Sequence, residues 1–260
     1  MSRRLRVALL AGGRSSEHDI SLASARSVLE ALDPDRYEVV NVAIGRDGRW
    51  ALEAGARPGP DPVTELSRAE AGPAETLPVP AESGTLASIG AVDVVLPILH
   101  GPFGEDGTVQ GLLELMDVAY VGAGVAASAL AMDKDLFKKV MRDSGIPVAR
   151  HHALRLGDPV ENPFGYPVFV KPARLGSSVG ISKVHDESEL APAVELARRH
   201  DEKVLVEEFV AGTEIEVGVL GNLPTPEASL PGQVVSHFAD WYDWASKYDE
   251  GGSELVIPPP

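Results

Sequence analysis

The sequence predicts an α/β protein that begins with a parallel β-sheet, on the evidence of two apolar runs and the residues that follow them. The run at 5–11 breaks at Gly12-Gly13 and leads into a helical pattern, which is how a doubly wound α/β unit opens. The run at 92–99 is continuously apolar, as in strands buried on both faces of a parallel sheet. We therefore predict a Rossmann-like amino-terminal domain, in which ligands bind at the carboxyl ends of the strands.

Composition and charge favour a soluble protein that acts on small molecules. The 260 residues predict two or three domains, and 44% hydrophobic with 24% charged residues is ordinary for a globular protein. No apolar run is long enough to span a bilayer and there is no cysteine, so we expect a cytoplasmic protein without a membrane partner. The net charge of −16 argues against a nucleic-acid partner.

The charges are unevenly distributed along the chain. Between residues 131 and 183 there are nine Lys or Arg against five Asp or Glu, whereas between 201 and 260 there are two against twelve. A locally basic segment in an acidic protein suits an anionic small molecule, although ordinary surface scatter explains the same counts.

The amino-terminal part contains further predicted elements and one insertion. Residues 37–44 are predicted to form the second strand, and the turn at 46–49 leads the chain toward Trp50. A serine or aspartate between 15 and 19 is expected to cap the helix over 20–32. The segment 55–84 has six prolines and four glycines and no aromatic residue, so we predict a flexible surface insertion.

His100 directly follows the second apolar run and opens the segment HGPFGEDG. A position at the carboxyl end of a strand favours a ligand contact, although a core histidine bonded to backbone would also occur there. A helix over 108–116 and a short strand at 119–121 are predicted to follow.

Beyond residue 124 the pattern changes to helix, with helices predicted over 125–132 and 133–144. Lys134, Lys138 and Arg142 repeat at i, i+4 and i+8 and share one helix face, which we interpret as mostly solvated. A later helix is predicted over 188–200, where Pro192 is tolerable only in the first turn.

The last part of the chain predicts two strands and an aromatic stripe. The strands are expected at 203–209 and 214–220, with Glu207 at the end of an apolar run. Either an ordinary strand end or a contact to ligand hydroxyls would explain that glutamate. Three aromatic residues between 241 and 248 have helix-like spacing, which more often marks packing than a ligand platform.

The segment 167–184 carries the strongest chemical signal. An apolar strand ends at Lys171, Pro172 stops its ladder, and a loop of glycines and serines over 174–180 leads into a second strand. Loop amides and hydroxyls can surround phosphate oxygens while the lysine supplies a point charge. The alternative interpretation is a flexible hairpin with an exposed lysine, because short Gly-rich patterns give false positives.

Other catalytic patterns are missing from the sequence. No two histidines have the spacing of metal ligands, so we predict no metal-binding residue in this chain. There is also no dinucleotide fingerprint, no Walker loop and no G-x-S-x-G elbow.

Five motifs, in order across nearly the whole chain, give it a specific resemblance to the D-alanine–D-alanine ligases of the ATP-grasp superfamily. They lie at 12–18 with 21–25, 100–107 with 110–111, 131–134, 170–174 with 176–180, and 242–243 with 247–248. The resemblance implies an amino-terminal substrate-binding domain over 1–124, a central ATP-grasp domain over 125–212, and a carboxyl-terminal ATP-grasp domain from 213 that is incomplete at 260.

The resemblance also implies a nucleotide site. Lys134 and Lys171 correspond to the lysines that contact the nucleotide phosphates, and Ser177 and Ser178 lie in the mobile loop that covers them. The adenine and ribose contacts correspond to Glu207 and Glu214.

The implied D-alanine site draws on other segments. Glu17 corresponds to the acid near the ammonium of the first D-alanine, and His100 lines the same site. Lys247 corresponds to the cation for the carboxylate of the second D-alanine. Tyr248 would close the site through a hydroxyl network with Ser177 and Glu17, and it favours D-alanine over a D-lactate acceptor.

The implied reaction is the ATP-dependent joining of two D-alanines through an acyl phosphate, for peptidoglycan precursors. D-alanine and ATP are the expected small-molecule partners. Whether the protein forms a homodimer is left open. The resemblance implies Mg²⁺ as well, with its ligands in a segment after the position of Pro260, so the chain as written is expected to be inactive. The alternatives are another carboxylate–amine ligase on this fold, such as a D-alanine–D-lactate enzyme, and an inactive nucleotide-binding fragment.

Overall fold

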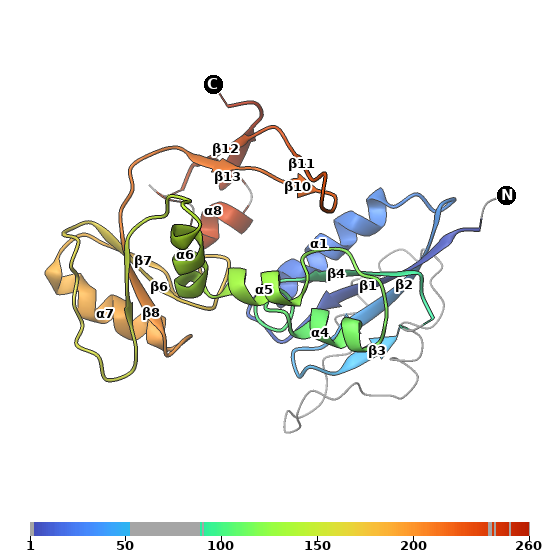
Figure 1. Cartoon of the computed structure of the whole chain (residues 1–260), viewed down its shortest axis with the longest axis horizontal. Helices are drawn as coiled ribbons and strands as arrows, with labels where there is room; N and C mark the ends of the chain where they lie inside the picture. Colours follow the sequence, from blue (N-terminus) through green and yellow to red (C-terminus); the bar gives the residue numbers. More distant parts are fainter. Residues whose placement is uncertain are drawn as a thin grey trace. The chain divides into compact units, whose positions relative to one another are not determined.

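The computed structural model describes residues 3–52, 89, 91–238, 241, 243–249 and 251–259, so the predicted insertion at 55–84 lies outside the described residues. The chain divides into two units, residues 1–137 and 138–260 (Figure 1). The domain boundaries at 124/125 and 212/213 stay predictions.

The first unit is built on a four-stranded sheet with the strand order β3-β2-β1-β4. β1 (Leu5–Gly12) pairs in parallel with β2 (Tyr37–Ile44) and with β4 (Val94–Leu99). β3 (Trp50–Leu52) adds an antiparallel edge. The predicted parallel sheet is therefore confirmed, and β2 has the predicted bounds.

Helices cover both faces of this sheet, as the alternation of side chains along β1 requires. Leu9 belongs to a buried cluster with Leu22 of α1 (His18–Ala31) on one face. Leu10 belongs to a second buried cluster with Leu113 of α4 (Thr108–Leu115). α5 (Val125–Met132) follows α4 in the chain (Figure 1). Burial on both sides explains why these strands are continuously apolar.

Two local predictions in this unit need correction. The residue before α1 is Glu17, whose side chain makes no capping hydrogen bond, so the predicted Ser or Asp cap is wrong. The Ser15 hydroxyl is used elsewhere, because it donates to the His100 carbonyl and accepts from the Glu17 amide. The strand predicted at 119–121 is reduced to a single parallel bridge between Val95 and Tyr120.

α6 (Lys134–Asp143) confirms the helix predicted over 133–144 to within one residue at each end. Asp133 defines its start, because its Oδ1 atom accepts from the amides of Asp135 and Leu136, each at 3.1 Å. An aspartate at this position satisfies amides that have no partner inside the helix.

The second unit contains a four-stranded sheet with the order β5-β8-β6-β7, in which every pair is antiparallel. Its strands are β5 (His151–Leu154), β6 (Val168–Pro172), β7 (Ser182–Val184) and β8 (Val204–Glu208). α7 (Glu187–Arg198) covers one face, where Val168 and Val170 join Leu190 in a buried cluster (Figure 1).

The strand predicted over 214–220 is wrong, because the chain changes partners within it. β9 (Glu214–Glu216) pairs with β12 (Gly232–Ser236), which also pairs with β13 (Ser253–Val256). β10 (Val219–Leu220) instead pairs with β11 (Glu227–Ala228). The switch occurs at Gly218, whose backbone bonds to Ser229 through both N–H and C=O.

Two helices of this unit begin at aspartate caps, and these starts place Pro192 and Trp241 differently from the prediction. Asp186 caps α7, so Pro192 is the sixth helical residue and lies beyond the expected first turn. Asp243 accepts from the Ser246 amide and starts α8 (Trp244–Tyr248), which leaves Trp241 outside the helix. Trp241 packs instead on Phe169, with ring centroids 5.4 Å apart.

Within the described ranges, no helix has both the length and the apolar character needed to cross a bilayer.

Candidate functional site

A cavity of about 320 Å³ lies in the second unit, over the sheet of β5 to β8. Four apolar side chains, three carboxylates, two lysines, a serine and an alanine line it. They are Ala149, Phe169, Lys171, Ser178, Ile181, Glu207, Glu208, Val210, Glu214, Trp241 and Lys247. Six of the residues predicted or implied by the sequence thus come together or adjoin here: Lys171, Ser177, Ser178, Glu207, Glu214 and Lys247.

Strand alternation places the polar groups on the face opposite α7. Val168 and Val170 of β6 are fully buried toward α7, so the intervening Phe169 and the following Lys171 lie on the other face. Phe169 is the register partner of Glu207 on β8, which brings that carboxylate to the same face. The predicted end of the strand, from Lys171 to Pro172, is confirmed.

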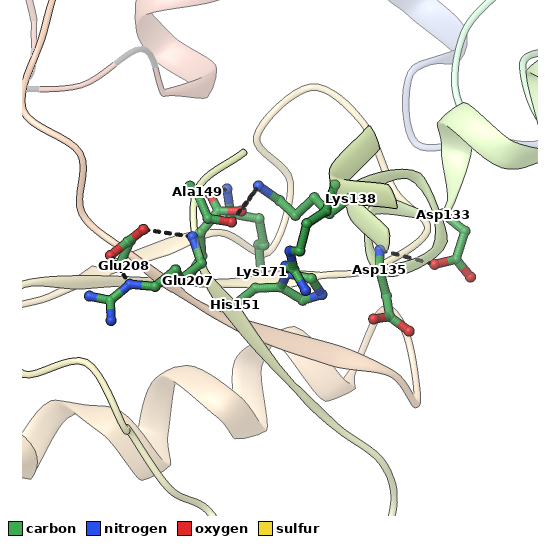
Figure 2. Close-up of polar contacts among 10 residues, drawn as sticks. Asp133, Asp135, Lys138, Ala149, His151, Lys171, Glu207 and Glu208 are labelled. Atoms are coloured by element: carbon green, nitrogen blue, oxygen red, sulfur yellow. Dashed lines mark hydrogen bonds and ion pairs between the residues drawn. The ribbon is translucent and has the colours of Figure 1, made fainter. Parts of the chain in front are cut away.

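Glu207 lies between two lysines (Figure 2). Its Oε1 atom is 2.5 Å from the Lys171 ammonium, and its Oε2 atom is 2.6 Å from the Lys138 ammonium. The side chains of Lys138 and Glu207 are only 14% and 10% exposed. The interpretation of Lys138 as part of a solvated face is therefore wrong, and Lys138 is the residue that sequence reasoning missed.

The two ammonium groups determine the protonation of this carboxylate. Burial alone would raise the pKa of Glu207, but the charge of Lys171 and the ion pair with Lys138 outweigh it and hold the pKa below its ordinary value. Glu207 is thus an anion with two cations at hydrogen-bonding distance.

Glu214 and Lys247 form a second charged part of the cavity wall. Although Glu214 as a whole residue is exposed, partial burial of its carboxyl raises its pKa, and the nearby Lys247 ammonium acts in the opposite direction. The structure therefore brings Lys247 close to the carboxylate implied for ribose and places both in one cavity.

The Gly/Ser loop between β6 and β7 has a constrained backbone. Ser177 and Ser178 have φ values of 51° and 61°, in the left-handed region that non-glycine residues seldom adopt. The Ser177 and Tyr248 hydroxyl oxygens lie 2.5 Å apart. Tyr248 in turn packs on Trp244, with ring centroids 4.6 Å apart, so α8 holds the loop at its tip.

In the first unit, Glu17 and His100 lie at the carboxyl ends of neighbouring strands. β1 and β4 end side by side, with Gly12 paired to Leu99. The Ser15 hydroxyl donates to the His100 carbonyl at 2.7 Å, and the His100 ring nitrogen lies 3.1 Å from the Ser24 hydroxyl. This is the edge at which ligands bind in open α/β sheets.

Gly101 allows the Glu17 carboxylate to approach the backbone closely. Glu17 is 2% exposed, and a Cβ atom added to Gly101 would lie 2.2 Å from its Oε2 atom. Gly101 also has a φ of +71°, which a glycine adopts without strain. Gly101, the second residue after β4, therefore leaves room for the Glu17 carboxylate.

The structure describes one contact of the implied network of Glu17, Ser177 and Tyr248. Ser177 and Tyr248 are in contact within the second unit, whereas Glu17 belongs to the first unit, and its contact with them stays a prediction. The role of Lys134 at the first position of α6 also stays a prediction.

The lining of the cavity suits a nucleotide. Phe169, Ile181, Val210 and Trp241 offer apolar surface to a planar ring, Glu214 can accept from hydroxyls, and Lys171 with the loop can hold phosphate. Magnesium has no comparable fit here, because no group of three His, Cys, Asp or Glu suited to a metal occurs among the described residues.

Two family models match the sequence, one described as the D-ala D-ala ligase N-terminus over residues 6–123 and one as the D-ala D-ala ligase C-terminus over 140–259. A D-alanine–D-alanine ligase of Mycobacterium sp. strain KMS is 47% identical over 287 aligned positions, covering 99% of this chain and 76% of that protein.

Solved structures of ligases are also similar to this chain. The D-alanine–D-alanine ligase from Coxiella burnetii is 36% identical with a TM-score of 0.71, covering 88% of this chain and 71% of that one. The VanG D-Ala:D-Ser ligase from Enterococcus faecalis is 30% identical with a TM-score of 0.77, covering 98% of this chain and 77% of that one.

Proposed function

The chain belongs to the D-alanine–D-alanine ligase family, and on this basis we propose that it joins two D-alanines into D-alanyl-D-alanine in an ATP-dependent reaction for peptidoglycan synthesis. A D-alanine carboxylate would take the γ-phosphoryl group of ATP with release of ADP, and the amine of the second D-alanine would then displace phosphate from this acyl phosphate. Mg²⁺ accompanies ATP in this proposal, and no residue of the described chain is assigned to it.

The observation that carries the proposal is the position of Lys171. It lies at the end of β6, on the open face of the sheet, beside a buried carboxylate and below the Gly/Ser loop. A fixed cation next to loop amides and hydroxyls favours the negative charge that develops on a phosphoryl group during transfer.

The remaining nucleotide contacts follow from the lining of the cavity. In the proposal, Lys134 and Lys171 contact phosphates and Ser178 donates from the loop. Glu207 and Glu214 bind the adenine and the ribose. The aromatic wall of Phe169 and Trp241 would exclude water from one side of the ring.

The proposal assigns the amino-acid contacts to other residues. Glu17 attracts the ammonium of the first D-alanine, with His100 beside it, and Lys247 attracts the carboxylate of the second. The contact between Ser177 and Tyr248 keeps the loop over the site, which protects the activated carboxylate from hydrolysis.

The proposal is tested on the protein through its natural carboxyl terminus, by phosphate release and dipeptide formation in the presence of ATP, Mg²⁺ and D-alanine. We expect phosphate release that depends on D-alanine, is absent with L-alanine, and matches D-alanyl-D-alanine detected by mass spectrometry. Phosphate release that is indifferent to D-alanine would refute the proposed ligation.

The likeness to the Enterococcus faecalis D-Ala:D-Ser ligase supports a second candidate, a different acceptor for the same activated D-alanine. Competition among D-alanine, D-serine and D-lactate at equal concentration, with the products separated by mass, distinguishes the candidates. The hydroxyl of Tyr248 leads us to expect that D-alanine is preferred over D-lactate.

A further inference from the structure

Glu207 is a buried carboxylate with two lysine partners, and only one of these lysines lines the cavity. Glu207 contributes one negative charge, and Lys171 and Lys138 each contribute one positive charge within 2.6 Å of it. Lys171 alone would already neutralise the carboxylate. The second lysine therefore needs an explanation beyond the neutralisation of Glu207.

Lys138 lies behind the cavity wall. Among the described residues that line the cavity are Ala149, Lys171 and Glu207, but not Lys138. Lys138 lies on α6. Its ammonium forms an ion pair with the Glu207 carboxylate and lies 3.4 Å from the Ala149 carbonyl oxygen (Figure 2). Lys138 therefore meets the cavity wall through two lining residues, Glu207 by an ion pair at 2.6 Å and Ala149 by a longer contact.

We propose that Lys138 is a positioning residue for nucleotide binding: it holds and neutralises Glu207, so that the charge of Lys171 is available to the nucleotide phosphates. The inference rests on the proposed function, because it takes the nucleotide as the occupant of the cavity. It adds a residue that does not line the cavity and does not belong to the implied site.

The physical reason is the cost of leaving a buried carboxylate without a cation. If Lys171 turned toward phosphate in a protein without Lys138, Glu207 would remain desolvated, unpaired and close to a polyanion. Lys171 would then stay with Glu207, and the phosphates would lose their cation. With Lys138 present, Glu207 keeps one cationic partner when Lys171 turns toward the phosphates.

Substitution of Lys138 tests the proposal through equilibrium binding. Calorimetric titration with ADP should show at least ~10-fold weaker binding to K138M than to the wild type, which corresponds to about 1.4 kcal/mol. K138R keeps the charge and should bind within about 3-fold of the wild type, as an arginine can still pair with a carboxylate. K139M removes the same charge from the exposed neighbouring position of α6 and should bind like the wild type.

A double-mutant cycle separates positioning from a general structural role. When Glu207 carries no charge, Lys138 has nothing to neutralise, so K138M should weaken ADP binding less than about 2-fold in the E207Q background. An equal loss in both backgrounds would overturn the proposal. If K138M does not fold, as judged by its thermal transition, K138Q makes the same comparison, and wild-type affinity in K138Q would also overturn it.

Failure of the inference is distinguishable from failure of the proposed function. A wild-type protein that binds neither ADP nor ATP contradicts the nucleotide site itself. A wild type and K139M that bind normally, together with a K138M that binds equally well, contradict only the role of Lys138.

Discussion

The hydroxyl oxygens of Ser177 and Tyr248 lie 2.5 Å apart, although 71 residues separate them in the sequence. This contact joins the tip of the Gly/Ser loop to the last turn of α8. Ser177 has a φ of 51°, so the bond also helps to hold a backbone conformation that is unfavourable in isolation.

S177A and Y248F should therefore each lower kcat/KM for D-alanine ligation, and the double variant should lose less than the product of the single losses. Groups that act through one contact give non-additive effects. The cycle is measured by coupled phosphate release at saturating ATP. Strict additivity would show that the two hydroxyls act independently.

K171A should reduce turnover by ~100-fold or more, as expected when an electrostatic contact to the transferring group is lost. Its thermal transition should remain cooperative, because the lysine lies on the open face of the sheet and outside the buried cluster against α7. K139A is the matched control on an exposed position. Near-normal kcat and KM for ATP in K171A would contradict the assignment.

G101A should displace Glu17, because the added Cβ would lie 2.2 Å from its carboxylate oxygen. We expect a higher KM for D-alanine and a lower Tm. G145A is the control, since Gly145 has a similar φ of +76° but an added Cβ there meets no atom within 4 Å. G145A should lower Tm through backbone strain alone, which costs about 1 kcal/mol in the free energy of unfolding. Equal KM values in the two variants would exclude the displacement of Glu17.

Asp201 is expected to make stability depend on pH in acid. Burial would raise its pKa, but hydrogen bonds from Arg174 and from the Lys203 amide hold the pKa below its ordinary value. A depressed pKa stabilises the folded state above the unfolded pKa of ~3.9, and this stabilisation is lost as pH falls through the folded pKa.

The Tm of the wild type should therefore fall more steeply than that of D201N as the pH is lowered from about 5 toward 3, given the ordinary carboxyl pKa. At neutral pH the wild type should be the more stable of the two. Parallel Tm profiles over this range would show that Asp201 does not contribute the expected linkage.

Local patterns were sufficient to predict much of the fold. β1, β2 and β4 follow from apolar runs because both faces of their sheet are buried, and the change from Val170 to Lys171 marks the end of β6. Family motifs supplied the candidate residues, five of which line the second unit's cavity: Lys171, Ser178, Glu207, Glu214 and Lys247.

Long-range relationships could not be predicted from the same patterns. The i, i+4, i+8 repeat on α6 indicates that Lys134, Lys138 and Arg142 share a face, but not that one of them meets Glu207 on a distant strand. The aromatic stripe divides because the Asp243 cap starts α8 after Trp241. The division of 214–220 depends on which strands are available to pair, which a single-strand pattern does not contain.

The alternation along β6 has a consequence for sequence change in this enzyme. Adding or deleting a single residue between Val168 and Lys171 would exchange the two sides of the strand, pointing a lysine at α7 and a valine at the cavity. Substitutions at Phe169 keep that phase and alter only the cavity wall. A mutant library aimed at nucleotide preference should therefore randomise side chains here at fixed segment length, since frame-preserving indels of one codon would abolish the core and the site together.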